Sequence, residues 1–233
     1  MKDAVNSFGF VPDIPHESPE RLGRRLLSAC KRLCGFPAHQ VEEACALATG
    51  LLRQGAPTSE KDHKGRDPLH LAVDAENMSM IKALIHAGAD LTSINHYGNS
   101  AFARAAFLCS ESALRLLAPG SDVNHISDNG KTPLMMALDN VISMHAGAQN
   151  DWAALRFLLA VSDLSIGFEG SEDPGKPMVS LIDYAREAID GEPLAIVERA
   201  VGAAEAKNQA EEIELAIGQQ ALAGGKSRRG LAL

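Results

Sequence analysis

The sequence predicts an all-α protein in which pairs of helices stack into a solenoid, and three observations lead to this prediction. A pattern of glycine, helix-starting residue and alanine recurs, with Gly65, Gly98 and Gly130 at intervals of 33 and 32 residues. Apolar residues between these glycines follow the spacing of amphipathic helices. Aromatic residues make up only 4% of the chain, which suits short, closely packed helices better than a β-sandwich. A repeat of this length is typical of stacked units that share one core.

The composition excludes several classes of protein. The chain has 233 residues, and a hydrophobic share of 45% argues against global disorder. The formal net charge of -8 argues against a nucleic-acid partner and favours a basic one. No stretch approaches the about 20 apolar residues of a membrane span, and Met1 to Phe10 does not resemble a secretory signal peptide. We therefore expect a soluble, cytoplasmic protein that contacts neither membranes nor nucleic acid.

Helices are expected in pairs along the chain. Ser18 and Pro19 open the first helix, because Ser caps a helix and Pro suits its first turn. Gly35 and Pro37 end it, and a second helix follows at about 38–53. Later pairs are expected near 69–76 and 78–86, 102–108 and 111–117, 134–144 and 151–160, and 181–189 and 193–206 or beyond. Each helix is too short to be stable alone in water, so the pairs must stack.

These elements suggest a division of the chain into five segments. We expect a flexible N-terminal arm at 1–17, an irregular capping repeat at 18–61 and the regular repeats at 62–165. A C-terminal repeat with a capping helix should follow at 166–217, and a disordered basic tail at 218–233. The stretch 141–151 lengthens the fourth unit, and 167–177 forms an acidic loop before the fifth. Such departures either mark a binding surface or reflect drift at tolerant positions.

Several motifs resemble those of the ankyrin repeat family. Asp67-Pro68-Leu69-His70-Leu71-Ala72 and Thr132-Pro133-Leu134 are similar to the family's Thr-Pro-Leu-His-x-Ala, which opens the first helix of each pair (helix A). Gly88-Ala89-Asp90 is similar to the Gly-Ala-Asp that follows the second (helix B). The resemblance is specific for about 62–165. It implies an ankyrin-type α-solenoid of about four to five helix-turn-helix repeats with short β-turn fingers, as in small stand-alone bacterial members.

The local chemistry agrees with this resemblance. Glycine in each finger tolerates a positive φ angle. Asp67 and Ser100 replace the family's Thr at the helix start, and both can still cap the helix. The resemblance implies that His70 braces the finger by hydrogen bonding. Gly88 and Gly120 are expected to end helix B in the left-handed conformation.

The resemblance also implies a non-enzymatic module for protein-protein interaction, without a cofactor. Family members usually contact partners through a concave face formed by the finger tips and the exposed side of helix A. Tyr97, Phe107 and Leu108 would form an exposed apolar cluster there, or Phe107 and Leu108 tuck under the insertion. The candidate partner-binding residues are His63, Arg66, His96, Tyr97, Asn99, Arg104, Phe107, Leu108, Asp128, Lys131, Asp139 and Asn140.

Arg104 stands where the family has a buried apolar residue. It either forms a half-buried ion pair or reaches out to a partner. Asp74 and Asp139 in the adjacent repeats are the nearest candidates for such a pair. A structural pair is favoured, because an unpaired buried charge is costly.

Other side chains give little support for catalysis or metal binding. Cys30, Cys34 and Cys45 could be drawn with His39 as a zinc site, but their apolar-stripe positions favour free buried thiols in a reducing compartment. No phosphate-binding loop, HExxH motif or nucleophile elbow is present, so we expect no enzyme. A basic run on the first helix suits the polar outer face of a terminal repeat better than a nucleic-acid site. The run is Arg21, Arg24, Arg25, Lys31 and Arg32.

Three biological roles fit a monomeric interaction module. The first is a bacterial effector that reaches a host cell without a cleaved signal peptide, with residues 1–17 or the basic tail as the delivery signal. The second is an inhibitor or immunity-type protein, since an acidic protein suits a basic toxin or enzyme. The third is a cytoplasmic scaffold. The sequence alone leaves these roles open.

Overall fold

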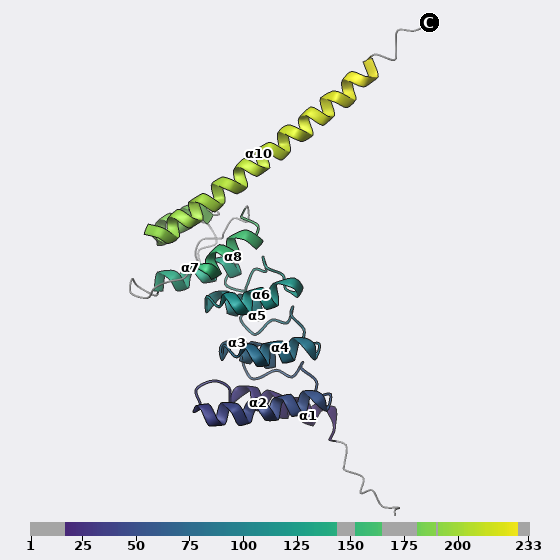
Figure 1. Cartoon of the computed structure of the whole chain (residues 1–233), viewed down its shortest axis with the longest axis vertical. Coiled ribbons are helices and arrows are strands. Elements are labelled where there is room, and N and C mark those ends of the chain that lie inside the picture. Colours follow the sequence, from purple (N-terminus) through teal and green to yellow (C-terminus); the bar gives the residue numbers. More distant parts are fainter. Residues whose placement is uncertain (1–16, 144–151, 165–180, 190, 228–233) are drawn as a thin grey trace, which may run out of the picture. The chain divides into compact units, whose positions relative to one another are not determined.

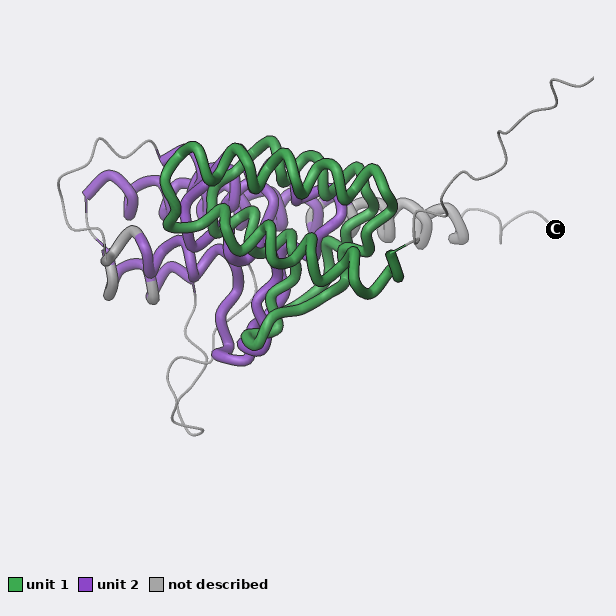
Figure 2. Tube along the Cα trace, turned by 90° about the horizontal axis from the view of Figure 1, so that it is seen from below, with its two compact units in different colours: residues 1–95 green, residues 96–233 purple. Residues whose placement is uncertain are grey.

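The computed structural model describes residues 17–143, 152–164, 181–189 and 191–227. It divides into two compact units, residues 1–95 (unit 1) and 96–233 (unit 2), which are coloured separately in Figure 2. The described residues form ten α-helices, one short 3-10 helix and no strand. Residues 1–16 of the expected arm, most of the 141–151 insertion, the 167–177 loop and the last six residues of the tail lie outside the described residues.

Unit 1 contains two helix pairs, α1 (Pro19–Lys31) with α2 (Ala38–Arg53) and α3 (Pro68–Asp74) with α4 (Met78–His86). The helices of each pair lie side by side (Figure 1), and across the pairs α1 contacts α3 while α2 contacts α4. Large apolar side chains from every helix are fully buried between these layers. Examples are Leu26, Leu51, Leu69 and Leu84.

Unit 2 continues the same arrangement with three pairs. They are α5 (Ala101–Phe107) with α6 (Glu111–Leu117), α7 (Pro133–Ser143) with α8 (Ala153–Val161), and α9 (Leu181–Ala188) with α10 (Gly191–Ser227). α7 contacts both α5 and α9, and α8 contacts both α6 and α10, so the helices form two parallel rows. Ala105 and Ala137 are completely buried, which confirms that small side chains let these helices approach closely.

The predicted helices agree with the observed ones to within one or two residues, except at the C-terminal end. There α10 continues to Ser227, well past residue 218, where the sequence suggested that a disordered tail begins. The segment from Ala210 to Ala223 is rich in Ala, Glu, Gln and Leu, which have high helix propensity. This composition offsets the cost of Gly218 inside the helix.

The finger turns and helix starts follow the sequence prediction. Gly65, Gly98 and Gly130 all have positive φ angles, of 74°, 69° and 71°. The Asp67 carboxylate accepts a hydrogen bond from the backbone N–H at the third position of α3, and the Ser100 hydroxyl does the same at α5. Each finger therefore leads into a capped helix.

The end of helix B was predicted correctly at Gly88, which adopts a φ angle of 81°. Gly55 follows α2 with a similar φ angle of 79°. After Gly88 the N–H of Ala89 donates to the carbonyl of Leu84 at 3.0 Å. This bond satisfies one of the last helical carbonyls, as in a Schellman-type helix end.

The same prediction was wrong for Gly120, which does not adopt a positive φ angle. Instead, α6 passes into a 3-10 turn, η1 (Ala118–Gly120). Pro119 lies inside this turn, and its ring fixes φ near the helical value. The chain therefore leaves α6 through a 3-10 turn and not through a residue in the left-handed conformation.

We predict that Gly98→Ala destabilises the protein more than Gly130→Ala does. Both changes strain a positive-φ residue by about 1–2 kcal/mol. A Cβ atom on Gly98 would also lie 2.6 Å from the backbone nitrogen of Asp128, whereas nothing lies within 4 Å of one on Gly130. This overlap should add about 1–3 kcal/mol. Urea unfolding measures both values, and equal losses would contradict the crowding of the Gly98 turn.

We also predict that Glu76→Gly stabilises the protein by about 0.5–1 kcal/mol. Glu76 is an exposed residue with a φ angle of 50°, a conformation that glycine adopts without strain. Ala75→Gly is the matched control, because Ala75 has a right-handed φ angle of -87° and should lose stability. Thermal unfolding of both variants tests this, and a destabilised Glu76→Gly protein would refute it.

Candidate functional site

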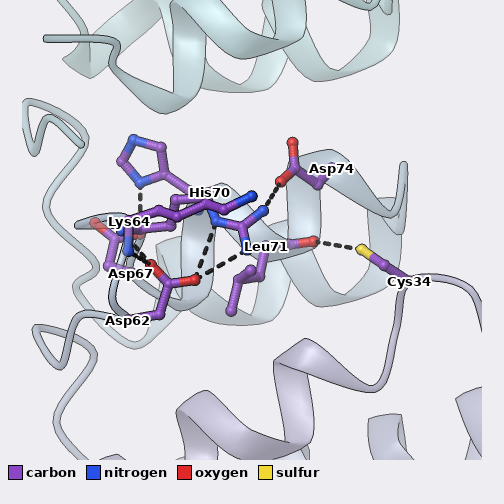
Figure 3. Close-up of polar contacts among 8 residues, drawn as sticks. Cys34, Asp62, Lys64, Asp67, His70, Leu71 and Asp74 are labelled. Carbon is purple, nitrogen blue, oxygen red and sulfur yellow. Dashed lines mark hydrogen bonds and ion pairs between the residues drawn. The ribbon is translucent and has the colours of Figure 1, made fainter. Parts of the chain in front are cut away.

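The first finger of unit 1 is tied to the end of its helix A by one arginine. The Asp62 carboxylate accepts from the backbone N–H groups of Lys64 and Arg66 at 2.8 and 2.9 Å. The Arg66 guanidinium donates to Asp62 through Nε and Nη2, and through Nη1 to Asp74 Oδ2 at 2.7 Å. Asp62 and Asp74 thus lie in one polar network (Figure 3). The network links finger and helix with the charges already paired.

A second polar contact fixes the start of α3. The buried His70 ring bonds through Nδ1 to Asp67 Oδ1 at 2.9 Å, which agrees with the bracing role that the resemblance implied. Burial raises the pKa of the Asp67 carboxyl, but hydrogen bonds with His70 outweigh this and hold the pKa below its usual value. The Cys34 thiol donates to the Leu71 carbonyl nearby (Figure 3).

Unit 2 repeats the link between finger and helix A in its second finger. The Lys131 ammonium pairs with the Asp139 carboxylate on α7, eight residues further along the chain. Arg66 and Asp74 have the same separation. The turn itself is closed by the N–H of Ser127, which donates to the Lys131 carbonyl at 3.0 Å. Two repeats therefore carry an equivalent cation-aspartate pair.

Within unit 2 the two fingers lie against each other. The N–H of Asp128 donates to the Tyr97 carbonyl at 3.3 Å, and His125 Nε2 contacts the Gly98 carbonyl at 2.9 Å. The C-terminal ends of α5 and α7 are adjacent as well, because Asn140 Nδ2 contacts Cys109 Sγ at 3.7 Å. We name the combined surface, formed by residues 96, 97, 99, 104, 107, 108, 128, 131 and 139, the finger-helix face.

The middle repeat replaces the cation-aspartate pair with neutral residues. Asn99 and Phe107 occupy the positions equivalent to Arg66 and Asp74 in the repeat before, and the same eight residues separate them. The Phe107 side chain is 38% exposed at the end of α5. The Arg104 guanidinium carbon lies 5.1 Å from the centre of the Phe107 ring, in cation-π contact. The finger-helix face thus presents an aromatic ring backed by a cation.

The remaining predicted residues divide between the two units. His63 and Arg66 belong to unit 1, where His63 is exposed. Nine of the other ten belong to the finger-helix face of unit 2, whereas Asn140 is buried, with only 8% of its surface exposed. Tyr97 is 55% exposed on the finger, whereas Leu108 is half-buried as the C-cap of α5. The alternative, in which Phe107 and Leu108 tuck under the insertion, concerns residues 144–151, outside the described residues.

Sequence reasoning did not name three contacts. Asp74 binds Arg66, and Asp139 binds Lys131. The half-buried Arg104 stacks on Phe107. Their spacing of three residues on a helix could have indicated the stacking. The recurrence of a cation and an aspartate eight residues apart could have indicated the ion pairs.

The described residues contain no group of three His, Cys, Asp or Glu side chains placed to hold a metal ion. All four cysteines are free, but only Cys30 is fully buried, and burial raises the pKa of its thiol to about 12. Cys34, Cys45 and Cys109 are half-buried, so the expectation of buried thiols was only partly right. Nowhere in the described ranges is a helix both long and apolar enough to cross a membrane.

Three of the five side chains in the basic run contact carboxylates at the start of α1. Arg21 and Arg25 contact the Glu17 carboxylate, and Arg24 contacts Glu20 at 3.2 Å. These pairs fit the polar outer face of a terminal repeat.

Stacked helix pairs joined by glycine-containing fingers define a helical repeat protein. Residues 38–127 match the sequence model of the family described as "Ankyrin repeats (3 copies)", somewhat less than half of the chain. The match begins at the first residue of α2 and extends beyond α6. Residues 38–127 are therefore ankyrin repeats, in agreement with the motifs found there. Ankyrin repeats are generally protein-protein interaction modules, and the family is typically non-enzymatic.

We predict that stability falls at acid pH as Asp62 and Asp67 become protonated. Burial raises the pKa of Asp62, but its hydrogen bonds with Arg66 and Lys64 outweigh this effect and hold the pKa below its usual value. A carboxyl with a depressed folded-state pKa stabilises above its unfolded pKa and loses this contribution as the pH falls through the folded value. The free energy of unfolding should therefore decrease below about pH 4.

The variant Asp62→Asn should make this decrease shallower, because the titrating group is gone. Urea unfolding between pH 2.5 and 7 measures the slope. Glu43→Gln, an exposed change on α2, serves as the control and should leave the slope unchanged. An Asp62→Asn protein with the wild-type slope would show that this carboxylate does not contribute to the acid sensitivity.

Proposed function

We propose that this protein is a non-enzymatic, monomeric interaction module that binds a protein partner through the finger-helix face. His63 and Arg66, the candidate residues of unit 1, are proposed as partner contacts of that unit by itself. The observation that carries the proposal is the exposed Phe107 ring at a position where the repeats before and after it carry a paired aspartate.

The surroundings of Phe107 support its role as an anchor. Aromatic and arginine side chains are enriched among the residues that contribute most to binding energy. Arg104 stacks on the ring and restricts its rotation, so less conformational entropy is lost on binding. Asp128, Lys131 and Asp139 supply a polar rim around this centre. An apolar centre within a polar rim is the usual anatomy of a protein-binding surface.

Two biological roles are proposed for this surface. An effector delivered into a host cell would bind a host protein and would need no enzymatic site of its own. An inhibitor or immunity-type protein would bind a toxin or enzyme, and the net charge of -8 supports a basic target. Capture from a host-cell lysate and from a lysate of the producing cell would separate these roles by the identity of the bound protein.

We predict that Phe107→Asp weakens the captured partner's binding by about 30-fold or more, which corresponds to about 2 kcal/mol. The new carboxylate removes the apolar contact and is solvated at a position where other repeats already carry aspartate, so the fold should be retained. Calorimetry with the captured partner measures the loss, and circular dichroism checks the fold.

Leu47→Asp is the matched control, because Leu47 has the same exposed fraction of 38% but lies on α2. It should leave the affinity unchanged. Retained binding by Phe107→Asp together with lost binding by Leu47→Asp would place the partner on the helix B side and refute the proposal.

A further inference from the structure

Three successive repeats fill the same two positions in different ways. The first has Arg66 and Asp74, the second Asn99 and Phe107, and the third Lys131 and Asp139. In the first and third repeats these residues form an ion pair between finger and helix A. Only the middle repeat places two uncharged side chains there. This difference in charge indicates which kind of side chain the partner would place on the middle repeat. The inference rests on the proposed function.

The charges in the flanking repeats are already engaged within the protein. Arg66 contacts two carboxylates at once, and its side chain is only 26% exposed. Lys131 is paired with Asp139, which is itself 25% exposed. A charged partner would have to compete with these internal pairs, which reduces its net gain in free energy. These two repeats therefore offer little to an ionic ligand.

The middle repeat offers an apolar contact instead. The exposed Phe107 ring carries Arg104 against it, and the half-buried Leu108 follows in the chain. Cys109 contacts both Asn140 and the Ala137 carbonyl, so this end of α5 is held against α7. The ring is thus presented by a fixed backbone. Removing it from water favours binding in proportion to the apolar area that the partner covers.

We propose that the partner places a large aliphatic or aromatic side chain of a peptide segment on Phe107, and that recognition at this repeat is apolar rather than ionic. The Lys131–Asp139 pair in the next repeat of unit 2 disfavours charged side chains, because they would have to compete with it. Affinity should then depend only weakly on salt, because screening acts on charged contacts.

The test uses the full chain to select binders from a phage-displayed library of random 12-residue peptides. The key variant combines Asn99→Lys with Phe107→Asp, which rebuilds in the middle repeat the pair found on either side. It should fold, because two repeats already tolerate this pair. The matched variant combines Lys131→Gln with Asp139→Asn, which removes the charges and keeps Phe107. Circular dichroism verifies both folds.

The proposal expects selected peptides that share a large apolar residue. Their dissociation constant should change less than threefold between 0.1 and 1 M NaCl. It should rise at least tenfold for Asn99→Lys with Phe107→Asp, and less than threefold for Lys131→Gln with Asp139→Asn.

Selected peptides that share charged residues would overturn the inference. So would an affinity that falls more than tenfold in 1 M NaCl, or an affinity that is unchanged in the Asn99→Lys, Phe107→Asp variant. If peptide binding were lost in the Lys131→Gln, Asp139→Asn variant instead, the finger-helix face would still be the binding surface, and only apolar recognition would be refuted. The inference would also be overturned if the peptides bound all variants equally and did not compete with the captured partner. The proposed function is tested separately, by the capture experiment with Phe107→Asp. Failure to enrich any peptide would count against an apolar peptide site.

Discussion

Within each unit, the burial of one helix pair against the next is the constraint on which the rest of the structure depends. Helices of seven residues, such as α5 and α6, are too short to be stable alone. Their apolar faces are buried by contacts of α5 with α7 and of α6 with α8. Because both rows use one face for stacking, the finger at Tyr97 and the C-terminal end of α5 at Phe107 are left exposed. The binding surface is therefore a consequence of the stacking.

The middle repeat keeps the backbone of its neighbours and changes the chemistry of that surface. Its finger has the same positive φ glycine, and its helix has the same hydroxyl or carboxylate cap, so neither position 99 nor position 107 is needed for folding. Arg66 with Asp74 and Lys131 with Asp139 instead connect finger and helix through ions. Such pairs at a half-exposed site contribute modestly to stability. Replacing one pair with an aromatic residue therefore changes recognition at little structural cost.

The sequence could predict those features that depend on local chemistry. Helix starts at Asp67 and Ser100 and the left-handed stop at Gly88 follow from single residues and were correct. Gly120 failed because the preceding proline favours a continued turn. Glu76 and Cys109 have positive φ angles without a glycine to signal them, since stacking imposes the turn there. The stacking of Arg104 on Phe107 and the two ion pairs depend on how each finger folds over its own helix, which residue spacing alone does not fix.

The central claim is that a protein partner covers the middle repeat of the finger-helix face. Hydrogen-deuterium exchange of the full chain, with and without the captured partner, tests it most directly. The account predicts slower exchange on binding for backbone amides in residues 96–108, with the amides of α2 and α4 unchanged. Slowing confined to α2, α4 or α10, with residues 96–108 unaffected, would contradict it.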